Sequence, residues 1–237
     1  MASLVTSSVN EHVFEIRFRP NARVLDFRGD WTATLGEALD LPEWHIDTNR
    51  IDVFAKDQSA RAFVAFRNAG MTLRDTGTPS LFPDKASQFI RQMFGLEGFG
   101  HTVHVERLGV RSKFGVGCSL PFAKLLQRFT ERYVSPTSSV TNVMGRNAKI
   151  VDAGAPLNLT DDLGQLNTMC GPMTREQFAQ FFSKDEGFPE VGLYFDVDYW
   201  LKPGEAMGAK EVEGQTRKFA AEAWAKKERL VAHLLES

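Results

Sequence analysis

Hydrophobic and polar residues alternate along several short stretches of the chain, which is the pattern of strands with one buried face. Near the start, Phe14, Ile16 and Phe18 alternate with charged residues until Pro20 ends the stretch. The clearest example runs from Gly192 to Lys202. Such alternation is typical of antiparallel sheets, in which one face is buried and the other is solvated.

Other stretches carry hydrophobic residues at every third or fourth position, as on one side of a helix. They predict helices at 24–39, from Pro83 to 94, after Pro121, at 178–182, and in a long final helix from Gly214 to Leu235. The remaining strands are expected at 43–46, 51–55, 61–67, 71–74, 101–114, 148–152 and 165–169. Parallel crossovers need a dozen or more residues, so strands this closely spaced must be antiparallel. We predict an α+β fold with a mostly antiparallel sheet, helices packed on one face and a long C-terminal helix.

The predicted elements follow a similar order in the two parts of the chain: helix, short strands, helix, long strand. This order predicts two pseudo-symmetric halves, 1–118 and 119–237, within one compact unit. Residues 135–145 are rich in Ser and Thr and contain Pro136, so they are the best candidate for a linker.

Composition and charge exclude several classes of protein. The 237 residues include 28 Lys and Arg and 30 Asp and Glu, a formal net charge of −2. Binding to nucleic acid usually needs a basic excess, so we do not expect nucleic acid as a primary partner. Only two cysteines occur, Cys118 and Cys170, in no metal-binding spacing. No membrane-length apolar run or signal segment is evident, so we expect a cytoplasmic protein without a membrane partner.

The acidic residues of the 192–202 strand are the first candidates for chemistry. Asp196 and Asp198 are two residues apart, so both carboxylates project from one face. Such a pair could bind Mg²⁺ or Ca²⁺, or divide acid and base roles. The alternative is a simple solvated face. Tyr194 and Trp200 share that face and indicate a covered or partner-facing surface.

A row of cations is the second candidate. Arg107, Arg111 and Lys113 align on one face of the 101–114 strand if no bulge intervenes. The row could bind an anionic ligand or an acidic partner. The alternative is pairing with cross-strand acids, such as those on the Asp196 strand.

The final helix carries apolar residues on more than one stripe, and Trp224 and Val231 lie on the second one. A helix that is buried on one side needs only a single broad stripe. We therefore expect either the chain's own sheet or a second chain to cover the surplus, and we favour self-association.

The stretch Val105-Glu106-Arg107-Leu108-Gly109-Val110-Arg111 resembles the R-[IL]-G-[LV]-R strand of a sporadically distributed, uncharacterised bacterial protein family. Members of that family also tend to end with an acidic strand and a long helix, to which 193–198 and the final helix are similar. The resemblance implies fold and class and carries no established activity.

No convincing catalytic constellation or cofactor motif emerges from the sequence, so we expect no cofactor. The favoured hypothesis is a non-enzymatic interaction or scaffold subunit of a bacterial multi-protein system, with host defence as one candidate role. The alternatives are a metal- or carboxylate-dependent enzyme centred on Asp196 and Asp198, and a binder of a small anionic ligand through Arg107 and Arg111.

Overall fold

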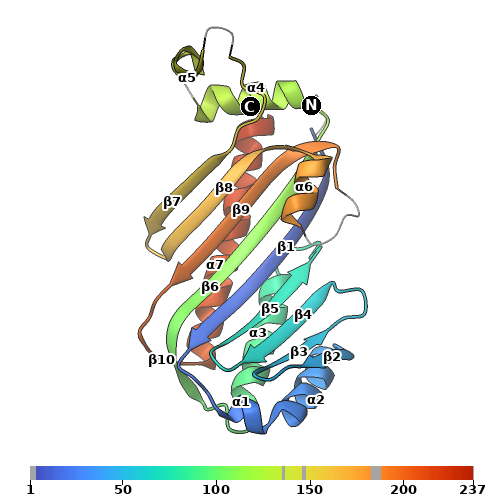
Figure 1. The fold of residues 1–237 in the computed structure, drawn as a ribbon, viewed down its shortest axis with the longest axis vertical. Helices are drawn as coiled ribbons and strands as arrows, with labels where there is room; N and C mark the ends of the chain where they lie inside the picture. The colour runs from blue at the N-terminus through green and yellow to red at the C-terminus, as the bar shows by residue number, and fades with distance from the viewer. Residues whose placement is uncertain (1–3, 135–136, 146–147, 183–187, 237) are drawn as a thin grey trace.

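Ten strands form one antiparallel sheet in the computed structural model, which describes residues 4–134, 137–145, 148–182 and 188–236 (Figure 1). The strands are β1 (Val5–Phe18), β2 (Glu43–Ile46), β3 (Arg50–Phe54), β4 (Ala60–Ala65), β5 (Asn68–Arg74), β6 (Thr102–Cys118), β7 (Ala155–Asp161), β8 (Gly164–Thr174), β9 (Val191–Leu201) and β10 (Glu205–Gly208). Their order across the sheet is β2-β3-β4-β5-β1-β6-β9-β8-β7, and β10 pairs with one end of β6. Both predicted halves of the chain therefore contribute to the same sheet.

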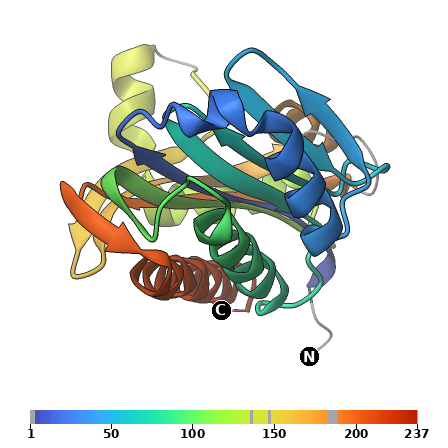
Figure 2. The same cartoon turned by 90° about the horizontal axis from the view of Figure 1, so that it is seen from below.

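Seven α-helices occur in the described part of the chain. They are α1 (Arg23–Asp26), α2 (Arg28–Leu39), α3 (Leu81–Gly95), α4 (Phe122–Tyr133), α5 (Thr137–Met144), α6 (Arg175–Phe181) and α7 (Ala209–Val231). The helices α3 and α7 lie side by side on one face of the sheet, where α7 contacts β6 and β9 (Figure 2). The predicted α+β architecture with a long C-terminal helix is confirmed.

Alternation in the central strands decides what each face of the sheet contains. In β1, Phe14, Ile16 and Phe18 are buried against the helices, whereas Glu15 and Arg17 point to the opposite face. Among the helices that the structure describes, only the short α6 packs on that second face, where its Phe178 is buried beside Val9 of β1. The helix-covered side holds the main core, and the other side stays largely uncovered (Figure 1).

The structure differs from the sequence predictions mainly between 134 and 161. Residues 148–152 form no strand; the strand β7 begins at Ala155, and its side chains are exposed on both faces after that residue. A strand with two exposed faces has no alternation of burial, so its pattern gives no signal. The predicted linker contains α5, although 135–136 lie outside the described residues. The strand predicted at 71–74 begins earlier, because Asn68 to Gly70 also belong to β5.

No helix in the described ranges combines the length and apolar character that a bilayer crossing requires. The longest helix, α7, carries charged residues along its length. Its hydrophobic residues are used instead against the sheet, where the ring of Phe219 stacks on that of Tyr199 at 5.3 Å between centroids.

A buried histidine lies where β1, α3 and α7 meet. The ring of His12 stacks on Phe82 of α3 at 4.9 Å and on Trp224 of α7 at 5.9 Å between centroids. Its Nδ1 lies 2.8 Å from the hydroxyl of Ser112 on β6. Burial lowers the pKa of His12 from 6.5 to about 4, and nearby Glu11 offsets only part of this effect. The imidazole is therefore neutral in the folded protein at neutral pH.

This low pKa predicts a pH-dependent loss of stability. The unfolded state takes up a proton at His12 below pH 6.5, whereas the folded state resists protonation down to about pH 4. The stabilising contribution of His12 to the free energy of unfolding is therefore fully present above pH 6.5 and is lost as the pH falls toward 4. We expect a loss of up to about 3 kcal/mol in the free energy of unfolding from this group. Urea unfolding of wild type and His12→Gln between pH 7 and 4.5 measures it, and equal pH slopes in the two proteins would contradict it.

Candidate functional site

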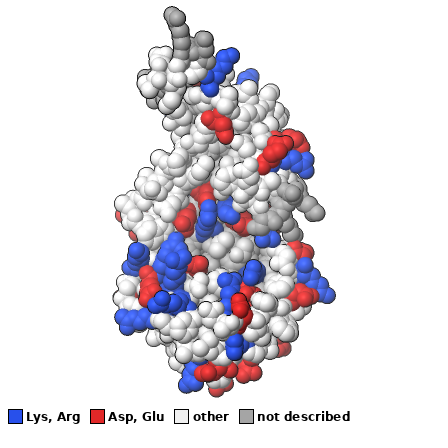
Figure 3. All heavy atoms as spheres, viewed as in Figure 1, with Lys and Arg blue, Asp and Glu red and all other residues white. Residues whose placement is uncertain are grey.

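The uncovered face of the sheet carries a network of charged side chains across its central strands. Lys, Arg, Asp and Glu side chains gather together on this face in Figure 3. They come from alternate positions of β1, β6 and β9, whose register places Lys113 beside Glu11 on one side and Asp196 on the other. The same register places Arg111 beside Asp198. These are the outward-facing positions of strands whose other face is core.

Glu11 is the most buried carboxylate of the network, and its side chain is only 5% exposed. Lys113 Nζ donates to one of its oxygens at 2.7 Å, and Arg74 Nε donates to the other at 3.1 Å. Lys113 also donates to the carbonyl of Phe181 at the end of α6, at 3.0 Å. Glu11 therefore links β5, β1 and β6, and Lys113 ties α6 to the sheet.

Arg111 and Asp196 form a two-point ion pair across β6 and β9. Arg111 Nε lies 3.0 Å from Oδ1 of Asp196, and its Nη2 donates to Oδ2. This hydrogen-bonded pairing raises the pKa of Arg111 further above its ordinary value. The hydroxyl of Tyr194 also donates to Asp196, at 3.3 Å, and burial raises the pKa of that phenol. Asp196 is thus fully engaged by groups of this chain.

Arg107 lies along the strand and reaches over Gly109 toward Asp198. Its Nη2 is 3.5 Å from Asp198 Oδ2, and its guanidinium carbon is 5.4 Å from the Trp200 ring centroid. A Cβ at Gly109 would lie only 3.0 Å from the Tyr199 carbonyl oxygen and 3.2 Å from Trp200 Cβ, so glycine permits the close approach of β9, and the Arg107 guanidinium lies over this bare position. Burial raises the pKa of Asp198, while Arg107 and Arg111 oppose that shift.

The sequence predictions for this face agree with the geometry in part. The cations Arg107, Arg111 and Lys113 do share one face, and the first two pair with the acids of β9. Lys113 pairs with Glu11 of β1 instead, an acid 102 residues away in the chain.

The same face gives the metal hypothesis little support. Asp196 and Asp198 point the same way, as predicted, but each faces a guanidinium. Among the described residues no group of three or more His, Cys, Asp or Glu side chains is arranged to hold a metal ion. The cysteines Cys118 and Cys170 are both buried, and burial raises the pKa of Cys170 to about 11. A thiol of that pKa is a poor nucleophile near neutral pH.

The four residues predicted to contact a partner are covered to different degrees by the chain itself. Tyr194 is 0% exposed beneath α6, with Phe181 at 4.5 Å between ring centroids. Trp200 is partly buried under Arg107. Trp224 stacks on His12, and Val231 belongs to the main core. The second stripe of the final helix therefore packs within this chain, and its role in self-association stays a prediction.

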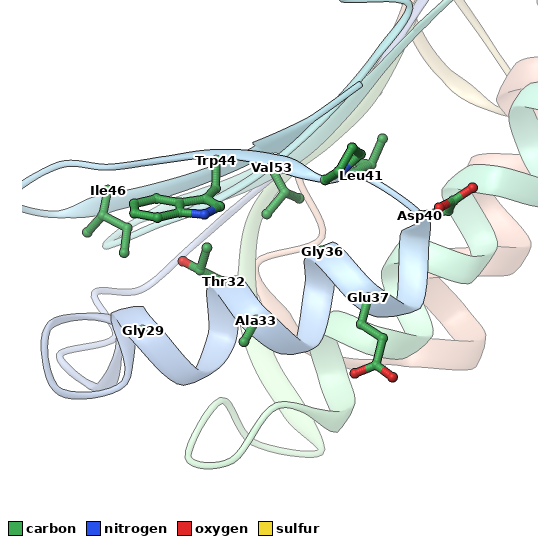
Figure 4. Close-up of a pocket in the computed structure, with 11 residues that line it drawn as sticks. Gly29, Thr32, Ala33, Gly36, Glu37, Asp40, Leu41, Trp44, Ile46 and Val53 are labelled. Carbon is green, nitrogen blue, oxygen red and sulfur yellow. The ribbon is translucent and has the colours of Figure 1, made fainter. Parts of the chain in front are cut away.

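An apolar groove, which the sequence did not predict, lies at the far end of the sheet between α2 and β2. The groove measures about 680 Å³, and Trp44, Ile46 and Val53 line its sheet side. In Figure 4 these side chains point from the strands toward α2, where Gly29 and Gly36 present no side chain. A Cβ at Gly36 would lie 3.2 Å from the Leu41 carbonyl oxygen, so glycine is what lets the chain turn closely around the helix end.

Trp44 stands out among the residues of this groove because it is 62% exposed. Within the described part of the chain its indole has no hydrogen bond and no ring contact. The signal in the sequence was a tryptophan in a short strand next to a helix with two glycines. Neither feature points to a groove until the strand is known to end the sheet.

Comparison with models of known protein families gives no match, and no curated protein matches the chain. The resemblance to the bacterial family with the R-[IL]-G-[LV]-R strand therefore stays a prediction.

The charge network predicts unequal roles for its two carboxylates on β1. Glu11→Gln leaves two largely buried cations without their carboxylate, so we expect a loss of about 3 kcal/mol in the free energy of unfolding. Glu15 is 25% exposed and pairs with the more exposed Arg17, so Glu15→Gln should cost less than about 1 kcal/mol. Urea unfolding at pH 7 compares the two variants. Equal losses would show that burial does not set the strength of this network.

Proposed function

We propose that this protein is a non-enzymatic interaction subunit that captures an extended segment of a partner protein in the groove between α2 and β2. The observation that carries the proposal is the solvent-exposed Trp44 in an apolar groove at the end of the sheet. Tryptophan is the residue type most enriched at the energetic centres of protein interfaces. A contiguous apolar groove that stays exposed in the folded chain is a feature of interaction sites.

The position of β2 indicates the form of the partner. β2 pairs with β3 on one side only and ends the strand order, so its other edge is open for pairing among the described residues. An extended segment can add to such an edge through main-chain hydrogen bonds while its side chains enter neighbouring pockets. Trp44, Ile46 and Val53 offer that segment an apolar surface.

The charges around the groove indicate the chemistry of the partner. Glu37 and Asp40 border the groove, although the Glu37 side chain points away from the strands in Figure 4, and neither has an ion-pair partner among the described residues. Arg28, the one cation of α2, donates hydrogen bonds to the carbonyl oxygens of Asp47 and Thr48. An apolar segment flanked by Lys or Arg therefore fits the groove better than an acidic one.

The wider assignment is part of the same proposal. The resemblance of 105–111 to a bacterial family and the absence of a catalytic motif in the sequence favour a subunit of a bacterial multi-protein system. The metal- or carboxylate-dependent enzyme is the weaker alternative, because both carboxylates of its proposed centre already face arginines.

A photoreactive amino acid at position 33 tests the groove in the protein's own cells. Ala33 lines the groove and is exposed, and the control position, Val151, is 78% exposed and precedes β7 at the other end of the sheet. We expect a discrete crosslinked protein from position 33 and none of the same mass from position 151. Trp44→Ala should weaken binding of that protein by about thirtyfold, as expected for an interface tryptophan. Asp40→Lys should also weaken it.

Two results would contradict the proposal. One is a crosslink from position 33 that survives Trp44→Ala unchanged, and the other is the absence of any crosslink specific to that position. Because Trp44 is exposed, Trp44→Ala should leave the melting temperature nearly unchanged. This control separates lost binding from lost folding. Crosslinking to a second copy of the chain or to a small molecule would show that the groove binds something other than a segment of a different protein.

A further inference from the structure

A small polar hollow lies in the middle of the charged face, apart from the groove beneath β2. It measures about 240 Å³ and is lined by residues of β1, β6 and β9: Val13, Glu15, Arg17, Arg107, Gly109, Arg111, Lys113 and Asp198. Four of these residues are cations and two are carboxylates. Lys113 and Arg111 already pair with Glu11 and Asp196 beside the hollow, so Arg107 and Arg17 are the cations with the most capacity left for a ligand.

Arg107 has hydrogen-bonding capacity that the described residues leave unused. Its nearest carboxylate oxygens, on Asp198 and Glu15, lie at 3.5 and 3.8 Å, and no hydrogen bond from its guanidinium to a described residue is formed. The side chain is nevertheless only 24% exposed. A guanidinium carries five N–H donors in a fixed plane, and leaving them unpaired in a partly buried position is unfavourable. A ligand in the hollow would satisfy them.

Two neighbouring arginines add further donors around the same space. Arg111 uses Nε and Nη2 on Asp196 and also contacts the Tyr194 hydroxyl, so only part of its five N–H donors remains for a ligand. Arg17 uses Nε on Glu15 and is 54% exposed. These two guanidiniums come from β1 and β6, and Gly109 leaves the space beside Arg107 free of a side chain.

We propose that this hollow binds the phosphate group of a small ligand. A phosphate monoester carries about two negative charges near neutral pH and offers acceptors to Arg107, whose donors the described residues leave unused. Its three terminal oxygens accept donors from several directions, whereas one arginine alone can satisfy a carboxylate. The hollow is smaller than a typical pocket for a whole ligand, so it holds the phosphate while the rest of the molecule extends over the open face. This inference is independent of the groove.

Titration of the protein with phenyl phosphate and with inorganic phosphate, at fixed ionic strength, tests the proposal. We expect saturable binding at millimolar concentration or below by isothermal calorimetry, with a rise in melting temperature that follows mass action. Arg107→Gln should weaken binding by at least about tenfold. The matched control is Arg217→Gln, which removes a cation that pairs with Asp84 away from the hollow and should leave binding unchanged.

A second variant keeps the test decisive if Arg107→Gln does not fold. Arg17→Gln alters an exposed side chain of the same hollow and should weaken binding while the protein remains folded. Three results would overturn the proposal: no saturable binding of either phosphate, equal weakening by Arg217→Gln and the hollow variants, or an equal effect of sodium chloride at the same ionic strength. Tighter binding of citrate than of phenyl phosphate would overturn the assignment to phosphate in favour of a carboxylate ligand.

Discussion

The antiparallel pairing of β1 with β6 joins the two parts of the chain, and the remaining strands are added outward from it. β1 has 14 residues and β6 has 17, and their ladder extends from Val5 opposite Cys118 to Phe18 opposite Val105. The pair fixes which side chains face the helices and which face outward, because a shift of one residue would exchange the two sets. A shift would expose Phe14 and bury Glu11 away from Lys113. The apolar core and the charged face therefore enforce the same register from opposite sides.

The alternation within these strands explains why the fold could be predicted and the sites only partly. Strands with one apolar face, such as β1 and β9, can be predicted from the alternation in their own sequence. The helix α7 can be predicted in the same way from its helical spacing of apolar residues. β7 has no such pattern, because it is exposed on both faces from Pro156 onward. The shared face of Arg107, Arg111 and Lys113 could be predicted because alternate residues of a strand point to the same side. Their partners could not, because the neighbour of a strand depends on the topology of the whole sheet, and Glu11 lies 102 residues from Lys113.

The groove beneath β2 and the hollow over Gly109 were missed for a related reason. Both depend on a glycine, which has no side chain. In a sequence, a glycine is equally compatible with a turn, a weak helix position or a close approach of two backbones. At Gly36 the neighbour is the Leu41 carbonyl, and at Gly109 it is the backbone of Tyr199 with the Arg107 guanidinium. The Leu41 carbonyl comes from the returning chain, and the Tyr199 backbone comes from the neighbouring strand β9. Only the assembled sheet shows that each of these glycines leaves space for a ligand, and does not serve to make the backbone flexible.

The two surfaces are separated by the sheet itself, and this has a consequence for how they can act. The groove opens on the helix side at β2 and β3, whereas the hollow opens on the uncovered side at β6. Four strand spacings separate β3 from β6, or roughly 19 Å. Sites that far apart without shared side chains contribute additively to stability and binding. Coupling between them would need a second arrangement of β4, β5 and β1, and the tightly paired Glu11 with Arg74 and Lys113 opposes any sliding of these strands. The sheet therefore acts as a rigid spacer that presents two separate surfaces.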